Sequence, residues 1–169
     1  MTLTSVLRLI LQCTGSKSLD LELAPQAALK IQPTVTLANG TGANQADKFF
    51  SDKRTLGNGA SEELDLAGAL VDAFGDTVTL ARVKVLYIYN PSADATLVIG
   101  GAAATQFAAF LGDVSDKIVL RPGGRLLLIA PDATAYVSTG GAADKLKIAH
   151  GGEGASGVDY EILVIGATA

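Results

Sequence analysis

Short runs of alternating apolar residues recur along the whole chain, with glycine or proline between them. Alternation places every second side chain on the same face of a strand. Residues 82–89 give the best example, because Val83, Val85, Tyr87 and Tyr89 share one face while Leu86 and Ile88 occupy the other. Since both faces are apolar, we expect this strand to lie centrally in a sandwich.

Further strands are predicted at regular intervals, and each is bounded by a turn signal such as Pro122-Gly123-Gly124 or Gly140-Gly141. They cover residues 77–80, 95–99, 117–120, 125–129, 135–138, 145–149 and 158–165. Such spacing favours an antiparallel β-sandwich or barrel with at least eight strands. Long amphipathic helices between the strands are missing, which argues against a parallel α/β fold.

The N-terminal part is also predicted to be extended. Residues 6–11 are apolar on both faces and read as a strand, not as a signal peptide. Residues 19–23 alternate leucine with acidic residues, and residues 30–37 contain Pro33, which suggests an edge strand. The surplus apolar positions in residues 6–11 predict a subunit contact.

One helix is expected near residues 67–74. Leu66, Leu70 and Phe74 recur at a spacing of four until Gly75 ends the pattern, which suits one or two helical turns. Phe49 and Phe50 follow a polar loop at residues 39–44, and one of them is expected to anchor this crossing against the core. The prediction is thus an all-β single domain spanning residues 1–169 with one or two short helices, and it leaves open whether residues 1–39 form an N-terminal strand pair or arm.

Composition narrows the function classes. Aromatic residues make up 5% of the 169 residues and Trp is absent, so the core must be aliphatic. The net charge is −4 and the thirteen Lys and Arg are scattered, which argues against nucleic-acid binding. No run reaches the roughly 18 apolar residues of a membrane-spanning helix, so no membrane contact is expected.

The motifs with possible chemistry each favour a structural interpretation. Gly152–Gly157 fits the GxGxxG pattern, but a strand and not a helix follows it, so no nucleotide is expected to bind. His150, the only histidine, is predicted to lie at the surface or rim. Cys13, the only cysteine, is predicted to be a small buried hydrophobe.

The acidic residues are predicted to solvate strand faces. Asp20/Glu22, Glu62/Glu63/Asp65 and Asp159/Glu161 mostly follow strand spacing, and no aromatic sugar platform accompanies them. Asn39 heads a formal glycosylation motif, and Asn44 with Asp47 offers oxygen ligands, but both sets are expected to serve loop structure. We therefore predict no catalytic, cofactor-binding or metal-binding residues, no cofactor, and no enzyme activity.

Several segments resemble small virion proteins of tailed phages and prophages. They are 40–47 (GTGANQAD), 52–56 (DKRTL), 61–68 (SEELDLAG), 74–75 (FG), 81–84 (ARVK), 121–124 (RPGG), 130–134 (APDAT) and 158–162 (VDYEI). This group is similar to capsid decoration or cement proteins. The resemblance implies a jelly-roll or related sandwich, a homotrimer, and attachment to the outside of the major capsid shell.

The expected function is accordingly a bacteriophage decoration protein that stabilises the capsid shell, located on the virion and in the host cytoplasm during assembly. Its partners would be the major capsid protein and further copies of itself. Two alternatives stay open: a tail- or fibre-associated virion protein, and a carbohydrate-binding module or enzyme on the same sandwich.

Overall fold

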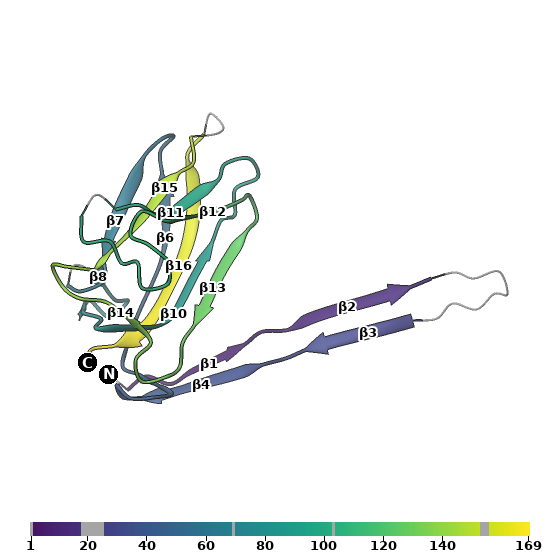
Figure 1. Cartoon of the computed structure of the whole chain (residues 1–169), viewed down its shortest axis with the longest axis horizontal. Helices are drawn as coiled ribbons and strands as arrows, with labels where there is room; N and C mark the ends of the chain where they lie inside the picture. Colours follow the sequence, from purple (N-terminus) through teal and green to yellow (C-terminus); the bar gives the residue numbers. More distant parts are fainter. Residues whose placement is uncertain (1, 18–25, 69, 103, 153–155) are drawn as a thin grey trace.

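The computed structural model describes residues 2–17, 26–68, 70–102, 104–152 and 156–169. Within these ranges the chain forms sixteen β-strands and no helix. Figure 1 shows two parts, a body of stacked sheets and a long two-stranded arm that extends away from it. The predictions of an all-β chain and of at least eight mostly antiparallel strands are confirmed.

The body contains two main sheets, and every strand pair in them is antiparallel. One has the order β13-β10-β16-β6, with β14 also paired to β10. Its strands are β6 (Lys48–Leu56), β10 (Arg82–Tyr89), β13 (Arg125–Ile129), β14 (Tyr136–Val137) and β16 (Val158–Ala167). The other has the order β12-β11-β15-β7, built from β7 (Ser61–Asp65), β11 (Leu97–Gly100), β12 (Lys117–Leu120) and β15 (Lys145–His150).

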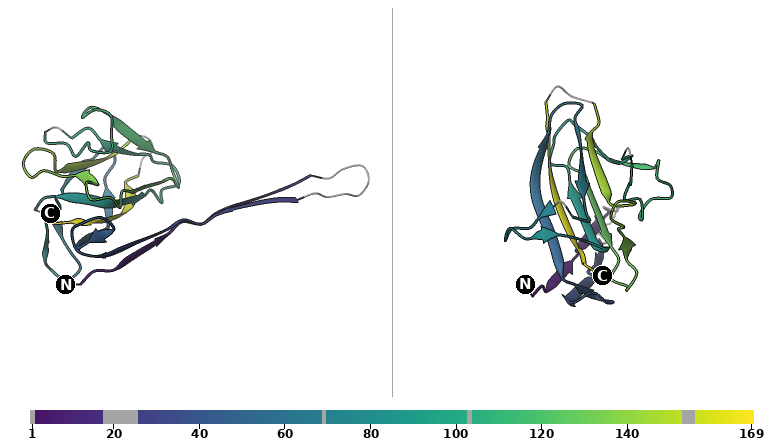
Figure 2. Two further views of the ribbon diagram at one scale, coloured as in Figure 1. Left: turned by 60° about the horizontal axis from the view of Figure 1, so that its bottom comes forward. Right: turned by 90° about the vertical axis from the view of Figure 1, so that its left-hand side faces the viewer.

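Smaller pairings complete the fold. The arm consists of β1 (Ser5–Arg8), β2 (Leu11–Ser16), β3 (Gln26–Ile31) and β4 (Thr34–Asn39). The short strand β5 (Gln45–Ala46) runs parallel to β4, and β8 (Leu70–Val71) pairs with β9 (Thr77–Val78). Figure 2 shows the arm leaving the body as one narrow ribbon.

The main core lies between the two sheets. Leu86 and Ile162 of the five-stranded sheet belong to the same buried cluster as Leu97 and Ile148 of the four-stranded sheet. Burial of such aliphatic side chains contributes about 1.5–3 kcal/mol each. Two antiparallel sheets that share one apolar core are consistent with a β-sandwich.

A second, smaller cluster lies on the outer face of the five-stranded sheet. Leu37 of the arm, Val85 of β10 and Ile165 of β16 are buried in it, and Phe49 packs against it. Phe50, the next residue, is buried in the main core instead. One of the two phenylalanines was predicted to anchor this crossing, and the structure uses both, one on each side of the sheet.

Strand β10 occupies the central position predicted for it, between β13 and β16. The predicted division of its faces is wrong at one end, because the pairing with β16 shifts register between Val83 and Val85. This β-bulge turns Val83 inward to join Leu86, while Val85 faces outward into the second cluster. An extra residue in a strand reverses the alternation beyond it.

The predicted helix near residues 67–74 is wrong, since this segment forms turns and the short strand β8. Asp72 explains the difference: its Oδ1 accepts hydrogen bonds from the backbone N–H groups of Phe74 and Asp76. A side chain that binds nearby backbone N–H groups competes with a helix. Gly75 has φ +88°, which fits the turn.

Candidate functional site

The arm is one antiparallel ribbon in two lengths. β1 pairs with β4, and further out β2 pairs with β3. Two residues separate the strands on each side, 9–10 and 32–33, so the pairing keeps the same register across the break. The backbone N–H of Leu9 donates to the carbonyl oxygen of Pro33 at 3.2 Å, which holds the two sides together there.

This register places the odd-numbered residues of both sides on one face, which we call the apolar face of the arm. Apart from Ser5 all its members are apolar: Leu7, Leu9, Leu11, Cys13 and Gly15 on one side, and Ala27, Leu29, Ile31, Pro33, Val35 and Leu37 on the other. The opposite face carries mainly polar residues: Arg8, Gln12, Thr14, Ser16, Gln26, Lys30, Gln32, Thr34 and Thr36, with Val6, Ile10 and Ala28. The arm is therefore amphipathic along its whole described length.

The apolar face is covered near the body and bare further out. At the root, Leu37 is fully buried and Leu7 and Val35 pack against the same cluster. In the outer half, Leu29 is 60% exposed and Leu11 is 51% exposed. A contiguous row of exposed aliphatic side chains marks an interaction surface.

An apolar groove lies where the arm leaves the body. It has a volume of about 330 Å³ between the arm root and the outer face of the five-stranded sheet. Its lining residues are Leu7, Arg8, Leu9 and Pro33 with Val35 from the arm, and Val85, Tyr87, Leu127, Ile129 and Leu163 from the sheet. The groove therefore continues the contact that the arm root already makes with this sheet.

The formal net charge differs between the arm and the body of the chain. Residues 5–17 and 26–39 contain Arg8, Lys17 and Lys30 and no acidic residue, which gives a formal charge of +3. Residues 18–25 contain Asp20 and Glu22, so residues 5–39 together carry +1 and residues 40–169 carry −5, the difference between −4 and +1. The two described sides of the arm are thus basic, and residues 40–169 are acidic.

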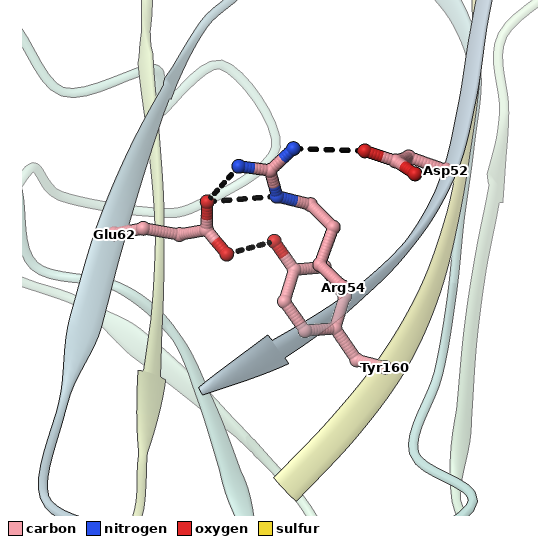
Figure 3. Close-up of polar contacts among 4 residues, drawn as sticks. All are labelled: Asp52, Arg54, Glu62 and Tyr160. Atoms are coloured by element: carbon pink, nitrogen blue, oxygen red, sulfur yellow. Dashed lines mark hydrogen bonds and ion pairs between the residues drawn. The ribbon is translucent and has the colours of Figure 1, made fainter. Parts of the chain in front are cut away.

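A polar cluster, drawn in Figure 3, joins the two sheets at one edge of the body. Glu62 of β7 accepts a hydrogen bond from the Tyr160 hydroxyl at 2.8 Å through Oε1. Its Oε2 accepts one from Arg54 Nε at 2.8 Å, and Arg54 Nη1 contacts Asp52 at 2.8 Å. The glutamate therefore ties β7 of one sheet to β6 and β16 of the other.

The environment of this cluster suits a structural role. Burial, followed by the hydrogen bond to Glu62, raises the pKa of Tyr160 far above its usual range. The hydrogen bond with Glu62 is the main cause that raises the pKa of Arg54. Because both groups hold their protons this firmly, neither is suited to proton transfer near neutral pH.

Two sequence predictions about single residues are wrong. Cys13 is exposed on the arm, since β2 is covered by no other element in the described part of the chain. His150 is buried, and both of its ring nitrogens have partners: Nδ1 accepts a hydrogen bond from Gly152 N–H at 2.9 Å, and Nε2 lies 3.1 Å from the carbonyl oxygen of Ser156. The centre of the glycine motif 152–157 lies outside the described residues.

The acidic residues divide into two kinds. Glu62 contradicts the expectation of a purely solvated face, while Asp159 stays at the surface with Lys53 at 3.2 Å and Thr55 at 2.7 Å. Thr55, Lys53 and then burial, which opposes them, set the lowered pKa of Asp159. Asp65 pairs with Lys145 at 2.7 Å. The pair Asp20/Glu22 lies outside the described residues.

The loop candidates Asn39 and Asp47 join segments that lie far apart in the sequence. Asn39 Oδ1 accepts a hydrogen bond from Leu3 N–H at 3.0 Å, and Asp47 accepts two from Thr168. Asn44 adopts φ +54° in the turn. Among the described residues, no group of three or more His, Cys, Asp or Glu side chains is placed to hold a metal ion.

The prediction of a subunit contact at residues 6–11 did not include the rest of the apolar face of the arm, although the signal was present in the alternation of residues 5–16 and 26–37. No helix in the described part of the chain is long and apolar enough to cross a membrane.

Comparison with protein-family models, with curated proteins and with solved structures finds no match for this chain. The exposed apolar face of the arm and the groove at its root therefore define the candidate site on their own geometry.

Proposed function

We propose that this chain is a bacteriophage virion structural protein without enzyme activity, a decoration protein that binds the outside of the major capsid shell as a homo-oligomer and stabilises it. The observation that carries this proposal is the arm, whose apolar face is bare over its outer half. A two-stranded ribbon is marginally stable in water on its own. An assembly that covers the apolar face of the ribbon would stabilise it.

The strand order supports the jelly-roll form of the sandwich. Counted in chain order, the eight main strands are β6, β7, β10, β11, β12, β13, β15 and β16. The first pairs with the last, the second with the seventh, the third with the sixth and the fourth with the fifth. This nesting corresponds to one long antiparallel hairpin rolled into two sheets, and jelly rolls are frequent in viral capsid proteins.

The charge distribution supports a protein partner over nucleic acid. The three cations of the arm are spread over its length, and the rest of the chain is acidic. A phosphate-binding surface needs a concentrated positive face. The arm instead offers an apolar stripe with scattered charge, which suits contacts between protein subunits.

Stabilisation would follow from mass action. A protein that binds the assembled shell but not its dissociated subunits shifts the equilibrium toward the shell. Several copies joined in one oligomer hold the shell more strongly than single copies, because each bound contact raises the effective concentration of the next. Three contacts of modest strength at a threefold position would match the expected trimer.

The test uses capsids of the encoding phage or prophage that lack this protein. We expect purified protein to cosediment with them and to raise their melting temperature. A variant in which Asn-Gly replaces residues 9–33 keeps β1 and β4, and we expect it to bind more weakly. Failure of the full chain both to cosediment and to raise the melting temperature would overturn the proposal.

Immunogold labelling of virions separates the two virion locations. Label over the whole head supports decoration, whereas label confined to the tail favours the tail-associated alternative. Unchanged capsid binding by the shortened variant would remove the arm from the mechanism.

A further inference from the structure

We infer that the apolar face of the outer arm, formed by β2 and β3, docks onto the outer face of the five-stranded sheet of a second copy of this chain, over Tyr87, Leu127 and Leu163. This inference deepens the homo-oligomer of the proposed function, on which it rests, by naming the two surfaces that meet.

The first argument is that the chain already makes this kind of contact with itself. At the arm root, Leu7 and Val35 of the apolar face lie on the outer face of the five-stranded sheet beside Leu163. Further out, Leu11 and Ile31 form a cross-strand pair of the same kind on the same face, but nothing in the described chain covers them. The outer half repeats a surface whose preferred partner is visible at the root.

The second argument is that the receiving surface remains partly open beside the root contact. The groove of about 330 Å³ continues from the arm root over the sheet. Leu127 on its sheet side is 37% exposed. Six residues of strand extend about 20 Å and the eight residues of β10 about 27 Å, so the sheet is long enough to receive the outer arm.

Charge favours the body of a second copy over a stacked pair of arms. Two arms laid face to face would bring like charges together, since each carries Arg8 and Lys30 and no acidic residue in its described strands. An arm on a body instead meets residues 40–169, which carry a formal charge of −5, and Glu161 lies with Lys53 at the neighbouring hollow. Opposite charges guide and orient such an encounter.

The small size of the contact predicts how many copies take part. A ribbon two strands wide and about 20 Å long covers roughly 200 Å² of sheet, whereas a standard interface buries about 800 Å² on each partner. One arm contact is therefore weak. A closed ring, in which every copy gives one arm and receives another, makes several contacts at once, and a trimer is a ring of this type.

The native Cys13 provides a direct test, because it lies on the apolar face and is exposed. Leu127→Cys adds a thiol on the receiving surface. The control is Val119→Cys, which adds a thiol on the four-stranded sheet at a position more accessible than Leu127, because Val119 is 57% exposed and Leu127 is 37% exposed. Mild oxidation at micromolar protein concentration, followed by non-reducing electrophoresis, reports which thiols meet.

We expect disulfide-linked species larger than dimers for Leu127→Cys, and at most the Cys13-linked dimer for Val119→Cys and for the wild type. Equal ladders in both variants would mean random collision and would overturn the inference. A fast-migrating monomer with an internal disulfide would also overturn it, because the arm would then fold back onto its own body. Absence of any species beyond the wild-type dimer has the same consequence.

A second measurement avoids cysteine chemistry. Leu29→Glu places a charge on the apolar face, and Ala28→Glu places the same charge on the opposite face at the next position. We expect light scattering to give a smaller mass for Leu29→Glu alone, with at least a tenfold weaker association. Equal effects of the two substitutions would contradict the docking.

Capsid binding is measured separately on the same samples. Cosedimentation without the disulfide between Cys13 and the thiol introduced by Leu127→Cys would leave the decoration function standing and remove the docking. That disulfide without cosedimentation would support the docking and contradict the decoration function.

Discussion

Replacing Tyr160 by phenylalanine tests what the polar cluster between the two sheets contributes. Tyr160 is fully buried, and its hydroxyl donates to Glu62 Oε1 at 2.8 Å. A hydrogen bond to a charged group contributes about 1.5–3 kcal/mol. Since the Glu62 side chain is 21% exposed, water can replace part of this bond. We therefore expect Tyr160→Phe to lower the free energy of unfolding by about 1–2 kcal/mol, without leaving a cavity.

The pH dependence gives this prediction a second signature. The pKa of Tyr160 is raised in the folded chain, so above about pH 10 the unfolded tyrosine releases its proton while the folded one keeps it. The folded state then binds more protons, and stability falls as the pH rises. The contribution of Tyr160 is fully present below about pH 10 and decreases by about 1.4 kcal/mol per pH unit above it.

Urea unfolding followed by circular dichroism, at pH 7 and at intervals up to pH 11, measures both effects. Tyr87→Phe is the matched control, because Tyr87 lies on the outer face of the same sheet and lines the groove. We expect the control to change stability by less than about 0.5 kcal/mol. A pH-independent difference between wild type and Tyr160→Phe, or a loss below about 0.5 kcal/mol at pH 7, would refute the reasoning.

Two further substitutions test other parts of the fold. A Cβ at Gly166 would lie 2.2 Å from the carbonyl oxygen of Arg82, so Gly166→Ala should lower the free energy of unfolding in urea by more than about 2 kcal/mol. Gly68 has open space around it, so Gly68→Ala should lower it by less than about 1 kcal/mol. Burial lowers the pKa of Lys84, so Lys84→Met should raise the melting temperature at pH 7. This gain should shrink as the pH approaches about 10.5, because the folded lysine loses its proton before the unfolded one does. A gain that grows with pH would contradict this prediction.

Much of the body could be predicted because its strands follow the rule of alternation closely. The predicted bounds 117–120 and 125–129 agree with β12 and β13, and β16 begins at Val158 as expected. The bulge at Val83 and Val85 could not be predicted in this way. A bulge is set by how two neighbouring strands fit, and that information is spread over β10 and β16.

The failed helix has a similar origin. A spacing of four between Leu66, Leu70 and Phe74 is typical of a helix, yet only the first two are buried and Phe74 is 71% exposed. The backbone there forms a turn in which Asp72 Oδ1 accepts hydrogen bonds from the N–H groups of Phe74 and Asp76. Local periodicity over two turns is a weak signal when a polar side chain can bind the backbone instead.

The apolar face of the arm could have been predicted from the sequence, but the cysteine on this face suggested a buried strand. Cys13 and the leucines near it alternate with polar residues, which predicts a strand with one buried face. The pattern says that the face is apolar, and it says nothing about which molecule covers it. Cysteine is usually buried in its own chain, so the prediction placed Cys13 in the core and not on an arm.

The arm combines the two outcomes that an apolar strand face can have. Its root is buried against Val85 and Ile165 of its own chain, which fixes where the ribbon starts and which way its apolar face points. The unbroken register then keeps the apolar residues on one face of the ribbon over about twelve residue pairs, a length of about 40 Å. A monomer gains nothing from keeping Leu11 and Leu29 exposed at that distance, because exposed apolar surface costs solubility. The same alternation that anchors the root therefore leaves an apolar face exposed further out, and this is the surface that the proposed docking would cover.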